Sequence, residues 1–193
     1  FRKDASESYP VLARFSNGKG TINPDFMPDV RGVALKIFEI GPEPNKTLDL
    51  LMTNSRVAFG KDHAEFVEFM EASKDGLPGL DFNLGHPRVV ASLLKCVWPP
   101  RSLAELTYGS GHPYLLGESR AMKMKLAPYD DHVNFLDAVG ATFHLIENHD
   151  FLRHELAERV STRGVRFTLS LQLENERDPA STPIEDALFE WTE

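Results

Sequence analysis

The sequence predicts an α+β fold in which a mostly antiparallel β-barrel carries helices packed on its outside. Two observations lead to this class. Strand-like segments at 10–17, 31–38 and 46–54 are joined by loops rich in glycine and proline, which are turn-forming residues. Apolar residues also occupy both alternating faces of these segments, as expected for strands covered on both sides in a barrel wrapped by other segments.

The alternation is clearest in the first segment. One face carries Val11, Ala13 and Phe15, and the other face carries Leu12 beside polar residues. Successive side chains of a strand point to opposite faces, so this pattern predicts a strand with two distinct surfaces. The second segment, 31–38, repeats the pattern.

Helices are predicted next along the chain. Apolar residues recur at helical spacing over 62–73, and Asp62 is a suitable N-cap. The segment 76–85 is expected to be a loop, and a second helix is expected over 86–98, with Pro87 in its first turn. The longest helical region is predicted at 130–163, where it breaks at 148–150 and resumes over 151–160 before Gly164.

Further strands are expected to complete the barrel. The segments 106–117 and 121–126 suggest a hairpin that turns near Gly117 and Glu118. The segment 165–175 alternates most regularly of all. We therefore expect a single domain over residues 1–193.

Composition narrows the classes of function. The chain of 193 residues has a net charge of -8 and a pI of about 5.4, which argues against a nucleic-acid partner. No apolar run approaches the roughly 20 residues of a membrane span. Cys96 is the only cysteine, so neither an internal disulfide nor a thiolate metal cluster is expected. A cytoplasmic location is expected, with a periplasmic one left open.

Three motifs in order resemble the haem catalase family. Arg14-Phe15-Ser16 is followed by DVRGVALKIF at 29–38 and by DLLMTN at 49–54, closing on FGKD at 59–62. That family runs RFS, DxRGFAVKFY and DLVGNNTPxFFxRD at similar spacing. The departures from the last motif, which include Arg56 and Ala58, are typical of a diverged, catalase-related branch.

The resemblance implies haem as cofactor and a peroxide as substrate. It predicts an enzyme that dismutates hydrogen peroxide or acts as a peroxidase, with organic hydroperoxides also compatible. The alternative is a catalase-fold module that binds a ligand, or serves a structural role, without redox activity. A homo-oligomer is compatible with both hypotheses.

The resemblance also implies roles for polar residues. Arg14 would bind a haem propionate, although a lone strand arginine is otherwise a surface residue. Ser16 would orient a distal histidine, or else bond the backbone of a turn. Thr53 and Asn54 match the position of a donor to peroxide, or else simply close a turn. Because neighbours on a strand point to opposite faces, only one can face the pocket, and Asn54 is expected there as the better donor.

The remaining implied contacts to haem are less polar. Val33, Phe59 and Phe66 match apolar positions near the porphyrin, although as bare residues they would be core. Ser110 and His112 match positions near the propionates, with Gly111 inserted between them, and the alternative is a glycine-rich turn. In that family the iron is bound by a tyrosine in an R-x-x-x-Y helix, and a catalytic histidine precedes the RFS motif. No tyrosine of this sequence lies in such a helix, so the resemblance implies no metal ligand in this chain, and no histidine precedes Arg14. We therefore expect the chain to be truncated at both ends and inactive alone.

Overall fold

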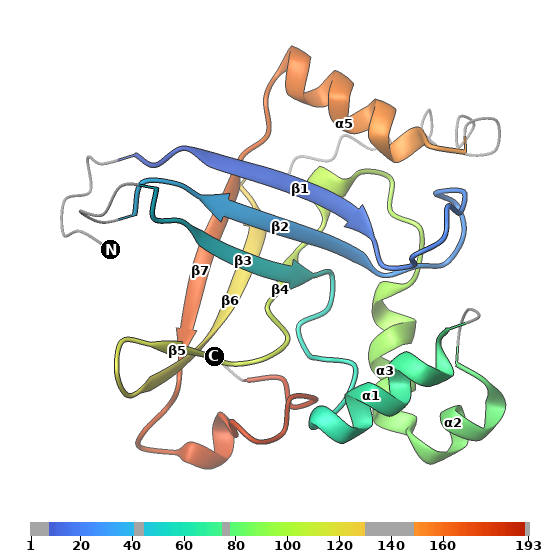
Figure 1. The fold of residues 1–193 in the computed structure, drawn as a ribbon, viewed down its shortest axis with the longest axis vertical. Helices are drawn as coiled ribbons and strands as arrows, with labels where there is room; N and C mark the ends of the chain where they lie inside the picture. Colours follow the sequence, from blue (N-terminus) through green and yellow to red (C-terminus); the bar gives the residue numbers. More distant parts are fainter. Residues whose placement is uncertain (1–7, 41–44, 75–77, 130–148, 192–193) are drawn as a thin grey trace.

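A mixed α/β arrangement is built on one antiparallel sheet (Figure 1). The computed structural model describes residues 8–40, 45–74, 78–129 and 149–191. Within these ranges the sheet has seven strands. They are β1 (Val11–Asn17), β2 (Arg31–Ile37), β3 (Leu48–Thr53), β4 (Tyr108–Gly109), β5 (Tyr114–Leu116), β6 (Arg120–Pro128) and β7 (Phe167–Leu173).

The strand order places β1 and β7 at the two ends of the sheet. The path runs β1-β2-β3-β4-β6, with β5 and β4 on one edge of β6 and β7 on its other edge. No pairing between β1 and β7 occurs in the described ranges, so the closed barrel expected from the sequence is not formed there. The sheet curls instead, and β1–β3 cross over β6 and β7 (Figure 1).

On the open side of the curled sheet, side chains rather than backbone bonds connect β1 with β7. The ring of Phe15 on β1 lies 6.1 Å from that of Phe167 on β7 and 5.9 Å from that of Tyr108 on β4. Around them the inward-facing residues of the sheet form one apolar core, here called the sheet cluster. Its buried members are Val33, Ile37, Leu50, Met52, Tyr108, Met122, Met124 and Leu126.

A second apolar core, here called the helix cluster, lies below the sheet. Its helices are α1 (His63–Ala72), α2 (Leu80–Gly85) and α3 (Pro87–Cys96), and α5 (Phe151–Thr162) lies apart from them, above β1 (Figure 1). The buried members are Val57, Phe59, Phe69, Val89, Leu93, Cys96, Val97 and Leu188. None of the helices in the described ranges combines the length and the apolar character that crossing a bilayer requires.

Several local predictions are confirmed. The backbone N–H of Glu65 donates to the Asp62 carboxylate, so Asp62 caps α1 as expected. Gly117 has a φ of 68° in the turn between β5 and β6, where Leu116 pairs with Arg120. The predicted helix over 130–148 lies outside the described residues, whereas its continuation is present as α5.

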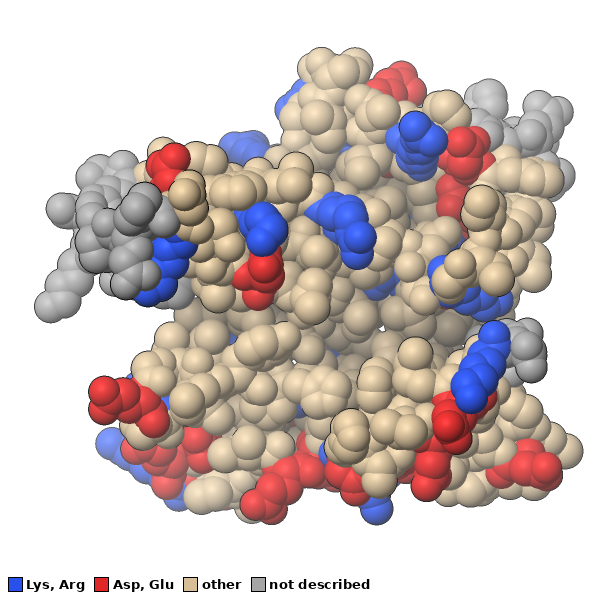
Figure 2. All heavy atoms as spheres, in the orientation of Figure 1, with Lys and Arg blue, Asp and Glu red and all other residues tan. Residues whose placement is uncertain are grey.

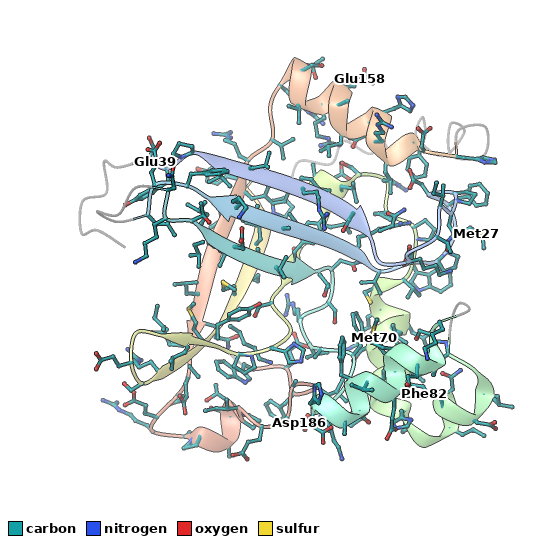
Figure 3. All side chains as sticks on the ribbon, viewed as in Figure 1. Met27, Glu39, Met70, Phe82, Glu158 and Asp186 are labelled. Atoms are coloured by element: carbon teal, nitrogen blue, oxygen red, sulfur yellow. The ribbon has the colours of Figure 1, made fainter. Side chains whose placement is uncertain are left out.

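Two local predictions are wrong. The expected loop at 76–85 contains the helix α2, because Phe82 packs toward α1, with its ring 6.1 Å from that of Phe69 (Figure 3). The strand β1 is not covered on both faces: Leu12 is 61% exposed. It is an edge strand, and only its inward face is packed by the sheet cluster.

Candidate functional site

The outer face of β1–β3 collects three of the predicted site residues. Strand register places Arg14 opposite Ala34, and Ser16 opposite Gly32. Gly32 in turn lies opposite Thr53. Because side chains on paired positions share a face, Arg14, Ser16 and Thr53 all stand on the side of the sheet that faces away from the sheet cluster. We call this surface the platform.

The centre of the platform is low and apolar. Gly32 has no side chain, and a Cβ built on it would lie 3.1 Å from the Ser16 hydroxyl oxygen. Ala34 adds only a methyl group beside it. Leu51, opposite Ala34, is 60% exposed. The platform therefore offers a flat area against which a planar apolar group could lie.

The platform carries two cationic side chains, and they differ in whether they form an ion pair within the described ranges. Lys36 is paired with Asp49 across β2 and β3, with a distance of 2.7 Å between Nζ and Oδ1. Arg14 is exposed and has no ion pair or hydrogen bond to any residue in the described ranges. Figure 2 shows that the charged side chains over these strands are few and are set in an uncharged surface. The Arg14 guanidinium is thus available to a ligand carboxylate.

Asn54 does not share this face, which corrects the expectation that it is the one directed toward the site. Its side-chain oxygen accepts from the backbone N–H of Arg31 at 2.9 Å. Its amide nitrogen donates to the carbonyl of Cys96 at 2.6 Å. Asn54 therefore joins the end of β3 to β2 and α3, and Thr53 occupies the position on the platform.

The apolar residues predicted to line a cofactor are distributed over the two cores. Val33 is 2% exposed in the sheet cluster, on the opposite face of β2 from the platform. Phe59 lies in the helix cluster, with its ring 5.4 Å from that of Phe69. Phe66 of α1 packs against the same cluster and meets His112 edge-on at 6.2 Å. The contacts of these side chains are those of core residues.

Ser110 and His112 form a tight turn between β4 and β5. The Ser110 hydroxyl donates to the His112 carbonyl at 2.9 Å and accepts from the backbone N–H of Met124 at 3.1 Å. Gly111 has a φ of 66°, which favours glycine. Burial, and secondarily the charge of Lys123, lower the pKa of His112. These contacts agree with the glycine-rich turn, and they place neither residue on the platform.

A buried arginine behind the platform was missed by the sequence reasoning. Arg31 is fully buried and donates to the Asp25 carbonyl at 2.8 Å and to the Asn17 side chain. The Asp25 carboxylate accepts from the backbone N–H of Leu152 at 2.9 Å. Burial lowers the pKa of Arg31, while Asp29 and Asp25 act in the opposite direction. The two aspartates shortly before an arginine at the start of a strand were the available signal.

The arrangement of metal-binding side chains and the state of Tyr108 bear on whether this chain could bind the iron of haem. Within the described ranges, no three or more His, Cys, Asp or Glu side chains are arranged to hold a metal ion. Tyr108 is the tyrosine nearest the sheet core, and its hydroxyl donates to the Leu103 carbonyl at 2.7 Å. Burial raises the pKa of Tyr108, so its phenol stays protonated.

Comparison with known proteins found no family model and no curated protein that matches the chain. The function is therefore argued from the geometry of the platform and from the motifs of the sequence.

Proposed function

We propose that this chain serves in a haem-dependent enzyme of the catalase type, which consumes hydrogen peroxide or an organic hydroperoxide. In this proposal haem lies on the platform. The observation that carries it is the register of β1–β3, which groups Arg14, Ser16 and Thr53 around Gly32 on one exposed face. These positions come from separate motifs of the sequence, and all of them belong to the resemblance with haem catalases.

The platform fits the shape and charge of the cofactor. A porphyrin is a flat apolar ring with carboxylates on one edge. Gly32 and Ala34 would leave room for the ring, and Leu51 would cover part of it. Arg14 would bind a propionate through its guanidinium fork. When bound, haem supplies the iron at which a peroxide O–O bond is cleaved.

The hydroxyl groups of the platform would act on the substrate. Ser16 and Thr53 flank Gly32 on opposite sides, so both hydroxyls border the lowest point of the surface. A hydroxyl can donate one hydrogen bond and accept others, and it can therefore orient a peroxide or a neighbouring imidazole. In this proposal Thr53, rather than Asn54, donates the hydrogen bond to the peroxide.

A second candidate function is a module that binds a planar anionic ligand without redox chemistry. It is favoured by the state of Tyr108, whose buried hydroxyl is already bonded to Leu103 and is unsuited to bind iron as a phenolate. Both candidates place the ligand on the same platform and use Arg14 in the same way. They differ in whether bound haem reacts with peroxide.

Titration with haemin, followed by absorption, tests the platform. A sharp Soret band is expected for the unchanged chain. Arg14→Ala should bind haemin roughly fivefold more weakly, because an exposed ion pair contributes about 1 kcal/mol. Lys36→Ala is the matched control, since Lys36 is a cation on the same face that is already paired with Asp49. It should bind within about twofold of the unchanged chain.

Equal losses in the two variants would mean that haemin responds only to net charge, and the platform would not be its site. Haemin binding without any peroxide turnover, in a chain that carries all flanking segments of its gene, would favour the module without redox activity.

A further inference from the structure

A cavity of about 610 Å³ lies on the outer side of β6 and β7. This volume is within the range of sites for small molecules, roughly 300–1,000 Å³. The segment 183–191 closes one side of it and runs below the lower ends of the two strands (Figure 1). Its lining includes Arg56, Lys123, Lys125, Leu171, Gln172 and Trp191.

Lys123 is the unusual member of this lining. It is 6% exposed, and its Nζ donates to the Phe189 carbonyl at 3.0 Å. The same nitrogen lies 5.3 Å from the centre of the Trp191 ring. No carboxylate in the described ranges lies within ion-pair distance of it. Glu190 is instead paired with Arg56 at 2.7 Å and Asp186 with Arg88 at 2.8 Å.

This environment makes the amine easier to deprotonate than an exposed lysine amine. Burial lowers the pKa of Lys123 from 10.5 to about 8, and Asp186 and Glu190 limit the shift. The other cations that line the cavity are Lys125 on the same strand and Arg56 after β3. His112 also interacts with Lys123, since burial and then the charge of Lys123 lower its pKa. Asp186 lies at the start of the closing segment, next to the first turn of α1 (Figure 3). A neutral lysine amine is a nucleophile toward carbonyl carbon.

We propose that Lys123 forms an imine with a small aldehyde of largely apolar body that binds in this cavity. The indole of Trp191 would contact the apolar part. The amine nitrogen attacks the carbonyl carbon and forms a C–N bond. The carbonyl oxygen then leaves as water with the two amine protons, which gives a C=N bond without any oxidant or reductant. This site does not depend on the platform or on haem.

Reductive trapping tests the proposal on the full chain. The protein is incubated with hexanal and sodium cyanoborohydride between pH 6 and 9, and alkylated lysines are mapped by peptide mass spectrometry. At pH 7.5 Lys123 should be alkylated at least about tenfold faster than Lys74, because the lowered pKa of Lys123 raises the neutral fraction of its amine. Lys74 is a suitable reference because its side chain is 68% exposed. The rate at Lys123 should level off above about pH 8.

A neighbouring lysine and a substitution of Lys123 itself serve as two further controls for the labelling experiment. Lys125 lines the same cavity two residues along β6, so preferential labelling of Lys123 over Lys125 would show that the buried position, and not entry to the cavity, decides reactivity. Lys123→Met should remove this one adduct and leave the rates at other lysines unchanged. Labelling of Lys123 at or below the rate of Lys74 would overturn the proposal. So would a rate at Lys123 that keeps rising in parallel with Lys74 up to pH 9.

Discussion

At the scale of single residues, burial decides which polar groups can react. Asn54 and Thr53 are neighbours, yet Asn54 is fully engaged by Arg31 and Cys96 while Thr53 faces outward. The sequence alone favoured Asn54, as the better donor, because local pattern does not fix the faces of a strand end that can bulge. Pairing of Thr53 with Gly32 removes that ambiguity, and it depends on a partner strand rather than on local sequence.

The lowered pKa of Lys123 predicts how the stability of the protein depends on pH. Its pKa is lowered to about 8, so between about pH 8 and 10.5 the unfolded chain binds more protons at this residue than the folded chain. Stability contributed by this residue therefore rises with pH across that window. Below it, the folded protein carries the full cost of a buried ammonium group.

Lys123→Met should accordingly stabilise the protein at pH 7 by about 1–2 kcal/mol, and this advantage should shrink as the pH rises from 8 to 10. Urea unfolding of both proteins at each pH measures the difference, in which the titrating groups that do not interact with Lys123 cancel. A difference that does not change with pH would show that the residue is not charged differently in the two states.

At the scale of elements, the alternation of apolar residues predicted the bounds of the strands better than it predicted how the strands pair into a sheet. The bounds of β1, β2 and β3 fall within two residues of the predicted segments, because alternation is a local property. The short helix α2 was missed, since glycine and proline at its ends resemble a loop. Burial of Lys123 could not be predicted either, because it depends on the distant segment 183–191.

The flat centre of the platform can be tested by adding a side chain at Gly32. Gly32→Val would place a branched side chain at the lowest point of the surface, beside the Ser16 hydroxyl. It should weaken haemin binding at least about tenfold, because the ring could no longer approach the sheet. Gly20→Val is the control, since a Cβ there meets no atom within 4 Å.

Absorption titration of both variants, with circular dichroism to confirm folding, measures the effect. Gly20→Val should bind as the unchanged chain does. A folded Gly32→Val protein with undiminished affinity would place the ligand elsewhere.

At the scale of the whole molecule, the sheet separates a packed interior from an outer surface that carries the two proposed sites. The sheet cluster fills the inward side of β1–β7, and the platform and the cavity of Lys123 lie on the outward side. Closure of a barrel was predicted from apolar residues on both faces, but Leu12 and Leu51 are exposed rather than covered in the described ranges. Apolar residues on an outward face here mark a candidate binding surface.

The most direct test of the haem proposal compares haemin with its dimethyl ester, which lacks the free propionates. Affinities of the unchanged chain and of Arg14→Ala for the two ligands form a double-mutant cycle. If Arg14 binds a propionate, esterification should weaken binding to the unchanged chain roughly fivefold and leave Arg14→Ala nearly unaffected, a coupling of about 1 kcal/mol. Equal effects of esterification on both proteins would contradict the account, because Arg14 would then make no contact with the cofactor's carboxylates.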